Sequence, residues 1–228
     1  MIYFVPTPIG NLGDITIRAK EILHQSKVII CEDTRQTGKL LDLLLIREEQ
    51  KLISSLYKEK FNYGQIEKFF GTCDENDIIS IVSDAGTPAI SDPGYEVLEM
   101  IIEAELPYTV LPGPTAFVPA LVASGLPSHE FLFVGFLPLK KGRMTKLKSL
   151  AALEETTIIL YESSHRLEKF IGELKVYFKP DTKVFVANDI SKMHERYWRG
   201  SVSDLTLEAL GDKGEFVVIV NQMDRKSI

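Results

Sequence analysis

Three turns rich in glycine and proline are the part of this sequence best suited to bind a ligand. They span residues 6–14, 83–94 and 111–116, and each follows a short apolar run. Glycine lets a backbone approach a ligand closely, whereas proline fixes the shape of a loop. The turn at 83–94 holds two aspartates, two glycines and two prolines in twelve residues. It is too long and rigid for a simple connection, so we interpret it as a binding loop. The other two could equally be tight connections.

Two charged segments could act on a hydroxyl or a phosphate. Glu32-Asp33-Thr34-Arg35 follows an apolar run and opens an expected helix. A carboxylate there could accept a proton and the arginine could hold a phosphate, although a helix N-cap with acids in the first turn looks the same. The run 140–148 has five cations and no acid. It could attract a polyanion locally or be a solvated helix face.

Several common sites are absent from the sequence. There is no P-loop and no Gly-x-Gly-x-x-Gly after the first expected strand, so a Rossmann-type nucleotide site is not expected. No His, Cys and Asp cluster has metal-ligand spacing. Cys31 and Cys73 lie far apart, and we expect both to be reduced packing residues.

Composition bounds the class of protein. The chain has 228 residues, of which 45% are hydrophobic and 25% charged, and this suits one large domain or two small ones. The net charge of −6 argues against nucleic-acid binding over the whole surface but not against a local basic patch. We expect no transmembrane helix, because no run of about 18 apolar residues occurs. No basic residue precedes the first apolar stretch, so we expect a cytoplasmic protein.

The elements that must position these residues alternate between strands and helices. In the first half we expect near-continuously apolar strands, which suit a parallel sheet buried on both faces. The expected strands are 2–5, 27–31, 52–56, 78–82 and 108–111, and the expected helices are 16–25, 34–45, 61–70 and 94–104. This order predicts an α/β architecture with right-handed crossovers.

The second half repeats the alternation less regularly. The expected helices are 114–124, 144–153 and 167–177, and the expected strands are 131–136, 157–161, 183–188, 196–200 and 216–220. Consecutive strands near the end, with no long helix between them, predict an antiparallel pairing. The segment Leu111-Pro112-Gly113-Pro114 is the natural hinge between an N-terminal lobe, 1–112, and a C-terminal lobe, 113–228. A ligand cleft at their junction is the default expectation.

The sequence resembles the ribosomal RNA small subunit methyltransferase I family of the tetrapyrrole (corrin/porphyrin) methylase superfamily. The motifs that carry the resemblance span the chain in family order: 6–12, Glu32–Arg35, Ser83–Gly94, Leu111–Ala116, 124–127 and Gly135-Phe136-Leu137-Pro138.

The resemblance implies a fold of two α/β lobes, with a mostly parallel sheet in the first and a mixed sheet in the second. It implies methyl transfer from S-adenosylmethionine to the ribose 2′-hydroxyl of a decoding-centre cytidine in the 16S rRNA of the small ribosomal subunit. It also implies a homodimer and no metal.

Roles carry over from the family by position. The cofactor set is Asp84, Ala85, Gly86, Thr87, Ser91, Thr115 and Ala116, with Tyr161, Glu162, Ala187 and Asn188 from the second lobe. The catalytic set is Glu32 or Asp33 as proton acceptor and Arg35 as phosphate clamp. The substrate set is Pro8, Gly10, Asn11, Lys140, Lys141, Arg143 and Arg166. His165, which precedes Arg166, could be only a capping or packing residue.

Two departures from the family pattern leave the acceptor open. The usual Ala-Arg-Glu is Ala187-Asn188-Asp189 here, and a segment rich in histidine is replaced by Leu56–Asn62. The substrate could therefore be bound differently. The alternatives are a methylase of porphyrin or corrin precursors and a non-catalytic ribosome-assembly factor.

Overall fold

The first half of the chain forms the predicted parallel sheet. A computed structural model describes residues 1–48, 50–53, 69–74, 76–92 and 94–222. Its strands in this half are β1 (Ile2–Phe4), β2 (Val28–Cys31), β3 (Lys51–Ile53), β4 (Ile79–Val82) and β5 (Tyr108–Val110). Within the described residues they form a five-stranded sheet in the order β3-β2-β4-β1-β5, and every pairing is parallel.

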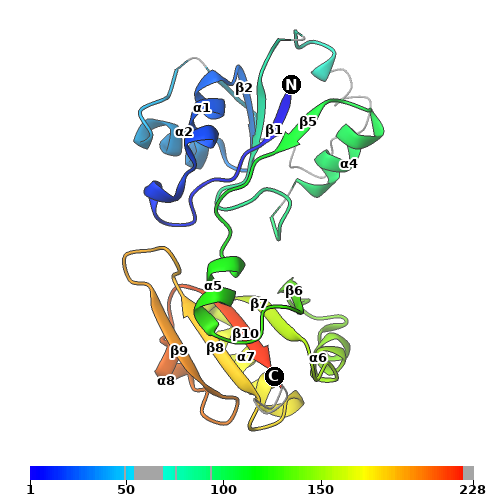
Figure 1. The fold of residues 1–228 in the computed structure, drawn as a ribbon, viewed down its shortest axis with the longest axis vertical. Coiled ribbons are helices and arrows are strands. Elements are labelled where there is room, and N and C mark those ends of the chain that lie inside the picture. Colours follow the sequence, from blue (N-terminus) through cyan, green and yellow to red (C-terminus); the bar gives the residue numbers. More distant parts are fainter. Residues whose placement is uncertain (49, 54–68, 75, 93, 223–228) are drawn as a thin grey trace. The chain divides into compact units, whose positions relative to one another are not determined.

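Helices cover both faces of this sheet. Successive side chains of a strand point to opposite faces, so a strand that is apolar at every position needs packing on both sides. The helices are α1 (Ile17–Gln25), α2 (Thr34–Leu43) and α4 (Tyr95–Glu103), with a 3-10 turn η1 (Leu12–Asp14) before α1. Ile30 and Ile81 pack toward Val97 of α4, whereas Ile29 packs toward Leu23 of α1. Figure 1 shows α1 and α2 on one side of the strands and α4 on the other. The strands are therefore apolar throughout because both faces are buried.

The second half forms a mixed sheet. Its strands are β6 (Phe131–Phe136), β7 (Thr157–Ser163), β8 (Lys183–Asn188), β9 (Arg196–Ser201) and β10 (Glu215–Asn221). The order over the described residues is β6-β7-β10-β8-β9. Only the β6–β7 pairing is parallel among these, and β8 and β9 form the predicted antiparallel pair. The fold class expected from the sequence is confirmed.

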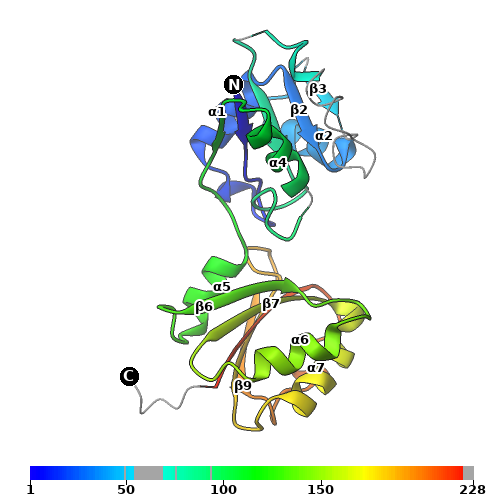
Figure 2. The ribbon, with the colours of Figure 1, turned by 90° about the vertical axis from the view of Figure 1, so that its right-hand side faces the viewer.

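Helices also flank the second sheet. They are α5 (Phe117–Ser124), α6 (Arg143–Ala151), α7 (Ser164–Tyr177) and the short α8 (Leu207–Leu210). One buried core joins α6, α7 and α8 to the face that carries Leu160, Val186 and Val218. Helix α5 contacts β8 and β10, and Figure 2 shows it across the sheet from α6 and α7. Different helices therefore cover the two faces of this sheet. We call the face under α6, α7 and α8 the α7 face, and the other the α5 face.

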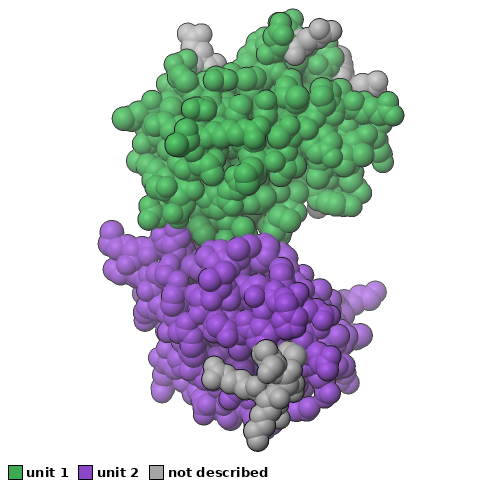
Figure 3. All heavy atoms as spheres, in the orientation of Figure 1, with its two compact units in different colours: residues 1–115 green, residues 116–228 purple. Residues whose placement is uncertain are grey.

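The chain divides into two compact units, Met1–Thr115 and Ala116–Ile228 (Figure 3). The helix expected from Pro114 begins instead at Phe117. The Pro114 carbonyl accepts a hydrogen bond from Thr87 Oγ1 at 3.0 Å, which holds the preceding segment outside the helix. Helix α7 begins at Ser164, three residues before its expected start. The helix expected at 61–70 lies almost entirely outside the described residues.

No helix in the described part of the chain is long and apolar enough to cross a membrane.

Candidate functional site

In unit 1, the turns rich in glycine and proline and the charged segment 32–35 gather at one edge of the sheet. Strands β2, β4, β1 and β5 are consecutive neighbours and all run in the same direction. The segments that follow them, 32–35, 83–94, 6–14 and 111–116, therefore leave the sheet from its carboxyl edge. In open α/β sheets this edge is where ligands bind.

Hydrogen bonds tie the turns to one another. Thr7 and Gly86 exchange two backbone hydrogen bonds, of 2.9 and 3.0 Å, and so form an antiparallel bridge between the β1 and β4 turns. The buried Thr7 hydroxyl also donates to the Ser83 carbonyl at 3.2 Å. Thr87 donates to Pro114 in the third turn. The three turns are thus one connected structure rather than independent connections.

Close packing and unusual backbone angles explain the residue types in these turns. Gly86 has a φ of +82°, and an added Cβ would lie 3.4 Å from Cγ2 of Ile9. A Cβ on Gly113 would lie 2.6 Å from Cβ of Pro6, so only glycine fits there. Ala89 and Ser91 adopt φ values of 68° and 64°, which cost energy for residues with a Cβ. Such strain persists only when the surroundings impose it, and it clusters at ligand sites.

Three carboxylates meet where the β2 and β4 turns are adjacent. The Asp33 backbone N–H donates to Asp84 Oδ1 at 3.2 Å, and the Asp84 N–H donates to Glu32 Oε2 at 3.5 Å. The Asp33 carboxylate caps α2 and accepts from Arg35 through its backbone N–H (2.8 Å), Nε (3.1 Å) and Nη2 (2.6 Å). Asp33 is therefore an N-cap of α2, as one interpretation of the sequence expected, and its carboxylate also holds the Arg35 guanidinium.

The environments of these carboxylates separate their pKa values. Hydrogen bonds from Arg35 lower the pKa of Asp33 to about 2. Burial, and then the charge of Asp84, raise the pKa of Glu32. Burial likewise raises the pKa of Asp84. Because desolvation and like charge disfavour the ionised form, Glu32 is the better proton acceptor of the pair that the sequence left open.

Two further polar side chains of unit 1 differ in their availability. The Thr115 hydroxyl oxygen is buried and has no hydrogen-bond partner among the described residues. A buried hydroxyl of this kind is suited to a ligand atom, since leaving it unpaired is costly. The Asn11 side-chain oxygen accepts from the Gly13 N–H at 3.0 Å and caps η1. Pro8 and Gly10 are partly or fully exposed in the same turn.

In unit 2, the four cofactor candidates divide between two faces of the sheet. Glu162 and Asn188 each pair with Phe216, and Phe216 belongs to the core under α7. Tyr161 and Ala187 pair with Val217, so their side chains lie on the α5 face. A ligand on one face of the sheet can therefore meet the side chain of Tyr161 or of Glu162, but not both. The same holds for Ala187 and Asn188.

The Glu162 side chain is committed to a buried ion pair. Arg143 Nη2 lies 3.3 Å from Glu162 and 2.7 Å from Glu173, and Arg143 Nε donates to both oxygens of Glu173. The side chains of Arg143 and Glu162 are only 4% and 1% exposed. The expectation that Arg143 contacts the substrate from a surface run is wrong, because its guanidinium links α6 to β7 and α7. The Glu162 carboxylate is held inside unit 2 by the same ion pair.

Asn188 is also engaged within the fold. Its Nδ2 donates to the carbonyls of Leu210 and Lys213, while its Oδ1 is buried without a partner among the described residues. A Cβ on Gly214 would lie 2.2 Å from that oxygen. The side chain thus holds the turn before β10, and it lies on the α7 face, away from Ala187.

The other basic candidates of unit 2 are more accessible. Lys140 and Lys141 are exposed ahead of α6. Arg166 is about one-third exposed, with its Nε 3.8 Å from Glu162 and its guanidinium 5.9 Å from the centre of the Phe136 ring. His165 is exposed on the first turn of α7.

Cysteines and acidic clusters give no metal site within the described residues. Cys31 and Cys73 are both free, and they pack with separate cores of unit 1. Burial raises the pKa of each thiol. No group of three or more His, Cys, Asp and Glu in this part of the chain could hold a metal ion.

Comparison with known proteins gives the family. A ribosomal RNA small subunit methyltransferase I from Hydrogenobaculum sp. is 42% identical over 224 residues, which cover 97% of this chain and 95% of that protein. The chain belongs to the ribosomal RNA small subunit methyltransferase I family. A second member, from Escherichia coli O157:H7, is 40% identical over 96% of this chain and 77% of its own length. The family model described as Tetrapyrrole (Corrin/Porphyrin) Methylases matches residues 1–206.

Solved structures support the fold. A uroporphyrin-III-C-methyltransferase from Thermus thermophilus aligns with a TM-score of 0.66 at 21% identity, covering 97% of this chain and 94% of that one. A structure of the Thermus enzyme complexed with S-adenyl homocysteine aligns with a TM-score of 0.64 at 18% identity, covering 97% of each chain. At these identities the likeness concerns the fold alone.

Two residues important to the site of this methyltransferase I family member were missed from the sequence. Thr7 and Ser83 join the β1 and β4 turns, yet neither stood among the candidate side chains. The only signal was their position next to the strands, and that is shared by ordinary turn residues.

Proposed function

We propose that this chain transfers a methyl group from S-adenosylmethionine to the ribose 2′-hydroxyl of a decoding-centre cytidine in 16S rRNA of the small ribosomal subunit. Membership of the family supports rRNA methylation. The observation that carries the chemistry is Glu32, a carboxylate of raised pKa at the carboxyl edge of a parallel sheet, beside an arginine held by Asp33.

The β4 turn and its neighbours fit the methyl donor. The proposed contacts are Asp84, Ala85, Gly86, Thr87 and Ser91, in a turn where Ala89 and Ser91 have positive φ values and Gly86 packs closely against Ile9. The unpaired Thr115 hydroxyl can bond a polar ligand atom. When bound, S-adenosylmethionine supplies an activated methyl group on a sulfonium. In unit 2, Ala116 and the α5-face residues Tyr161 and Ala187 are the remaining proposed contacts.

The acceptor chemistry requires removal of a proton from a weakly acidic hydroxyl. Glu32 is the proposed acceptor, because a base works best when its pKa approaches the working pH. Asp33 is unsuited, since Arg35 holds its pKa at about 2. It acts instead as a positioning residue that directs the Arg35 guanidinium.

Arg35 is the proposed phosphate contact of unit 1. Its side chain is 89% exposed, and the hydrogen bonds to Asp33 occupy only Nε and Nη2. A guanidinium has five N–H donors, so others remain for a phosphate oxygen. Pro8, Gly10 and the amide of Asn11 line the adjoining turn. In unit 2, Lys140, Lys141 and Arg166 are further proposed substrate contacts.

The deciding experiment uses labelled S-adenosylmethionine and small ribosomal subunits that lack the modification. The expected result is one methyl group per subunit, mapped by nuclease digestion to a 2′-O-methylcytidine. Calorimetry should give one cofactor bound per chain. Methyl transfer to uroporphyrinogen but not to subunits would favour a small-molecule methylase. Cofactor-free binding to subunits without transfer would favour an assembly factor.

Assembly and location follow from the same resemblance. A homodimer acting in the cytoplasm is proposed, and sedimentation of the purified protein tests the first part. A mass of one chain at micromolar concentration would contradict it.

A further inference from the structure

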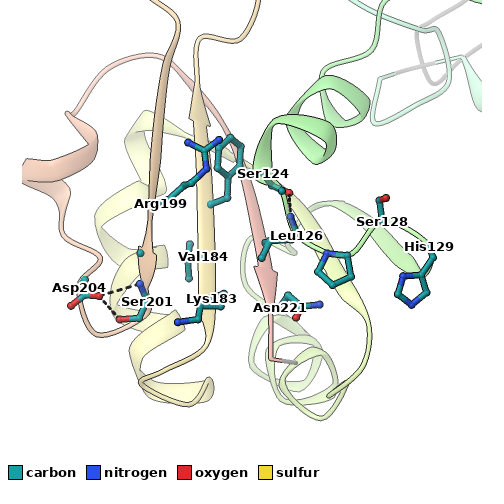
Figure 4. A pocket seen from close by; sticks show the side chains of 14 residues that line it. Ser124, Leu126, Ser128, His129, Lys183, Val184, Arg199, Ser201, Asp204 and Asn221 are labelled. Atoms are coloured by element: carbon teal, nitrogen blue, oxygen red, sulfur yellow. Dashed lines mark hydrogen bonds between the residues drawn. The ribbon is translucent and has the colours of Figure 1, made fainter. Parts of the chain in front are cut away.

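Unit 2 contains a pocket of about 700 Å³ on the α5 face of its sheet. It lies between the start of β8, the end of β9 and the turn after α5 (Figure 4). Lys183, Val184 and Phe185 line it from β8, at the opposite end of this strand from Ala187 and Asn188. The pocket is therefore separate from the proposed cofactor contacts of unit 2.

Arg199 contributes a rigidly held positive charge to this pocket. Its guanidinium lies 4.8 Å from the centre of the Phe185 ring and 5.9 Å from that of Tyr197. Nη2 donates to the Ala123 carbonyl in the last turn of α5. Stacking and this hydrogen bond fix the group, while the guanidinium keeps further N–H donors. If Arg199 served only to cap the end of α5, it would not need to line a pocket as well.

Lys183 adds a second cation to the lining. It is exposed at the start of β8 and forms no salt bridge with any described residue. The acid that lines the pocket, Asp204, accepts from the backbone N–H and the hydroxyl of Ser201. Asp204 is thus already hydrogen-bonded. The charge of the lining is net positive on a chain whose total is −6.

The remaining lining suits a nucleotide rather than a bare ion. Leu126 and Pro127 supply apolar surface, and the exposed Ser128 and His129 supply polar groups beside it. Phosphate and sugar groups of nucleic acids are contacted mostly by Arg, Lys and small polar side chains, and this lining offers such groups beside an apolar wall.

We propose that this pocket binds a backbone phosphate of the rRNA substrate and so adds a contact in unit 2 to those proposed for unit 1. The inference rests on the proposed function, because it names a second contact for the same substrate. It assigns Lys183 and Arg199 to affinity rather than to chemistry.

The test compares Lys183→Gln with Lys20→Gln, which removes an exposed lysine from α1. Methylation of small subunits is measured at several salt concentrations, and cofactor affinity is measured by calorimetry. Lys183→Gln should raise KM for subunits about tenfold, leave kcat and cofactor affinity unchanged, and reduce the slope of log affinity against log salt by about one. Lys20→Gln should match the wild type. Equal KM values and salt slopes for the two variants would overturn the proposal.

A second measurement separates this inference from the proposed function. Binding of unmodified subunits is followed by filter retention, without methyl transfer. If the wild type binds but does not transfer, the proposed function fails, whereas weaker binding of Lys183→Gln still supports the pocket. A changed oligomeric state of Lys183→Gln with unchanged subunit binding would assign the pocket to a contact between copies and overturn the inference.

Discussion

The two units each bring acids and an arginine together, but with opposite consequences. In unit 1, Glu32, Asp33 and Asp84 lie at a sheet edge, and the Arg35 side chain beside them is 89% exposed. In unit 2, Arg143, Glu162 and Glu173 form an ion pair network whose arginine is 4% exposed. The first cluster keeps donors and a carboxylate available, whereas the second satisfies its own charges.

The difference shows why a charged residue cannot be assigned from its neighbours in sequence. Arg143 stands within a basic run and yet is buried, because a paired charge can be taken out of water. Glu32 stands before a capping aspartate and yet keeps an accessible carboxylate. A charged side chain that is buried with an oppositely charged partner indicates a structural role. A carboxylate that is partly buried without a cation beside it indicates a role in the chemistry.

The largest expected effect is on methyl transfer when Glu32 is replaced. Glu32→Gln keeps the side-chain shape but cannot accept a proton, so single-turnover transfer should fall about 10²–10⁴-fold. Cofactor affinity should not change, and the variant should be no less stable than the wild type, because Gln removes a charge that folding disfavours. Glu21→Gln on α1 is the matched control. A transfer rate of Glu32→Gln within twofold of the wild-type rate would show that Glu32 is not the proton acceptor. The acidic cluster of unit 1 would then have no more catalytic role than the buried cluster of unit 2.

The pH dependence of the same step sharpens this prediction. The pKa of Glu32 is raised above its ordinary value, so transfer should increase as pH rises through that raised pKa. For stability the sign is opposite. The protonated form is favoured on folding, and this contribution is full below the ordinary pKa and is lost as pH rises through the raised one.

The second effect is on stability when the buried cluster is broken. Arg143→Met should lower the free energy of unfolding by about 3–5 kcal/mol, because Glu162 is left buried without its cation. Arg166→Met, which removes a more exposed arginine, should cost about 1 kcal/mol or less. Denaturant titration measures both. An Arg143→Met protein of unchanged stability that binds small ribosomal subunits more weakly would instead indicate that Arg143 contacts the substrate.

A smaller effect is expected from two glycines in different settings. Gly86→Ala places a Cβ at a φ of +82° and should destabilise by about 1–2 kcal/mol, with weaker cofactor binding. Gly172→Ala, in α7 with open space around the added Cβ, should stabilise by about 0.5–1 kcal/mol. Calorimetric unfolding compares them. Equal shifts would mean that the β4 turn carries no special strain.

The smallest effect concerns the exposed pair of Asp33 and Arg35. The pKa of Asp33 is lowered to about 2, so its ionised form stabilises the folded state above its ordinary pKa of 3.8. That contribution is lost as pH falls through about 2. Asp33→Asn should therefore unfold at a lower temperature than the wild type at pH 5, and the gap should close toward pH 2. A gap independent of pH would assign the role of Asp33 to capping alone.

Local patterns were enough to predict the fold class and the position of the turns that follow the strands. Apolar runs with both faces buried predicted the parallel sheet, and glycine and proline predicted where the chain turns sharply. Family motifs singled out Glu32, Asp33 and the residues of the β4 turn, and the structure brings these residues together at one edge of the sheet of unit 1. These features depend on neighbours along the chain, so they can be read without long-range contacts.

Only the tertiary structure decided which of these groups remain free to act. Glu32 and Asp84 are 52 residues apart and meet because β2 and β4 are paired. Arg143 and Glu173 meet because α6 and α7 cover one face, and β10 between β7 and β8 places Glu162 and Asn188 on that face. Solvation, and with it pKa and availability, depends on such distant partners. The sequence therefore predicted which segments hold the candidate residues, and packing determined the solvation and the partners of each side chain.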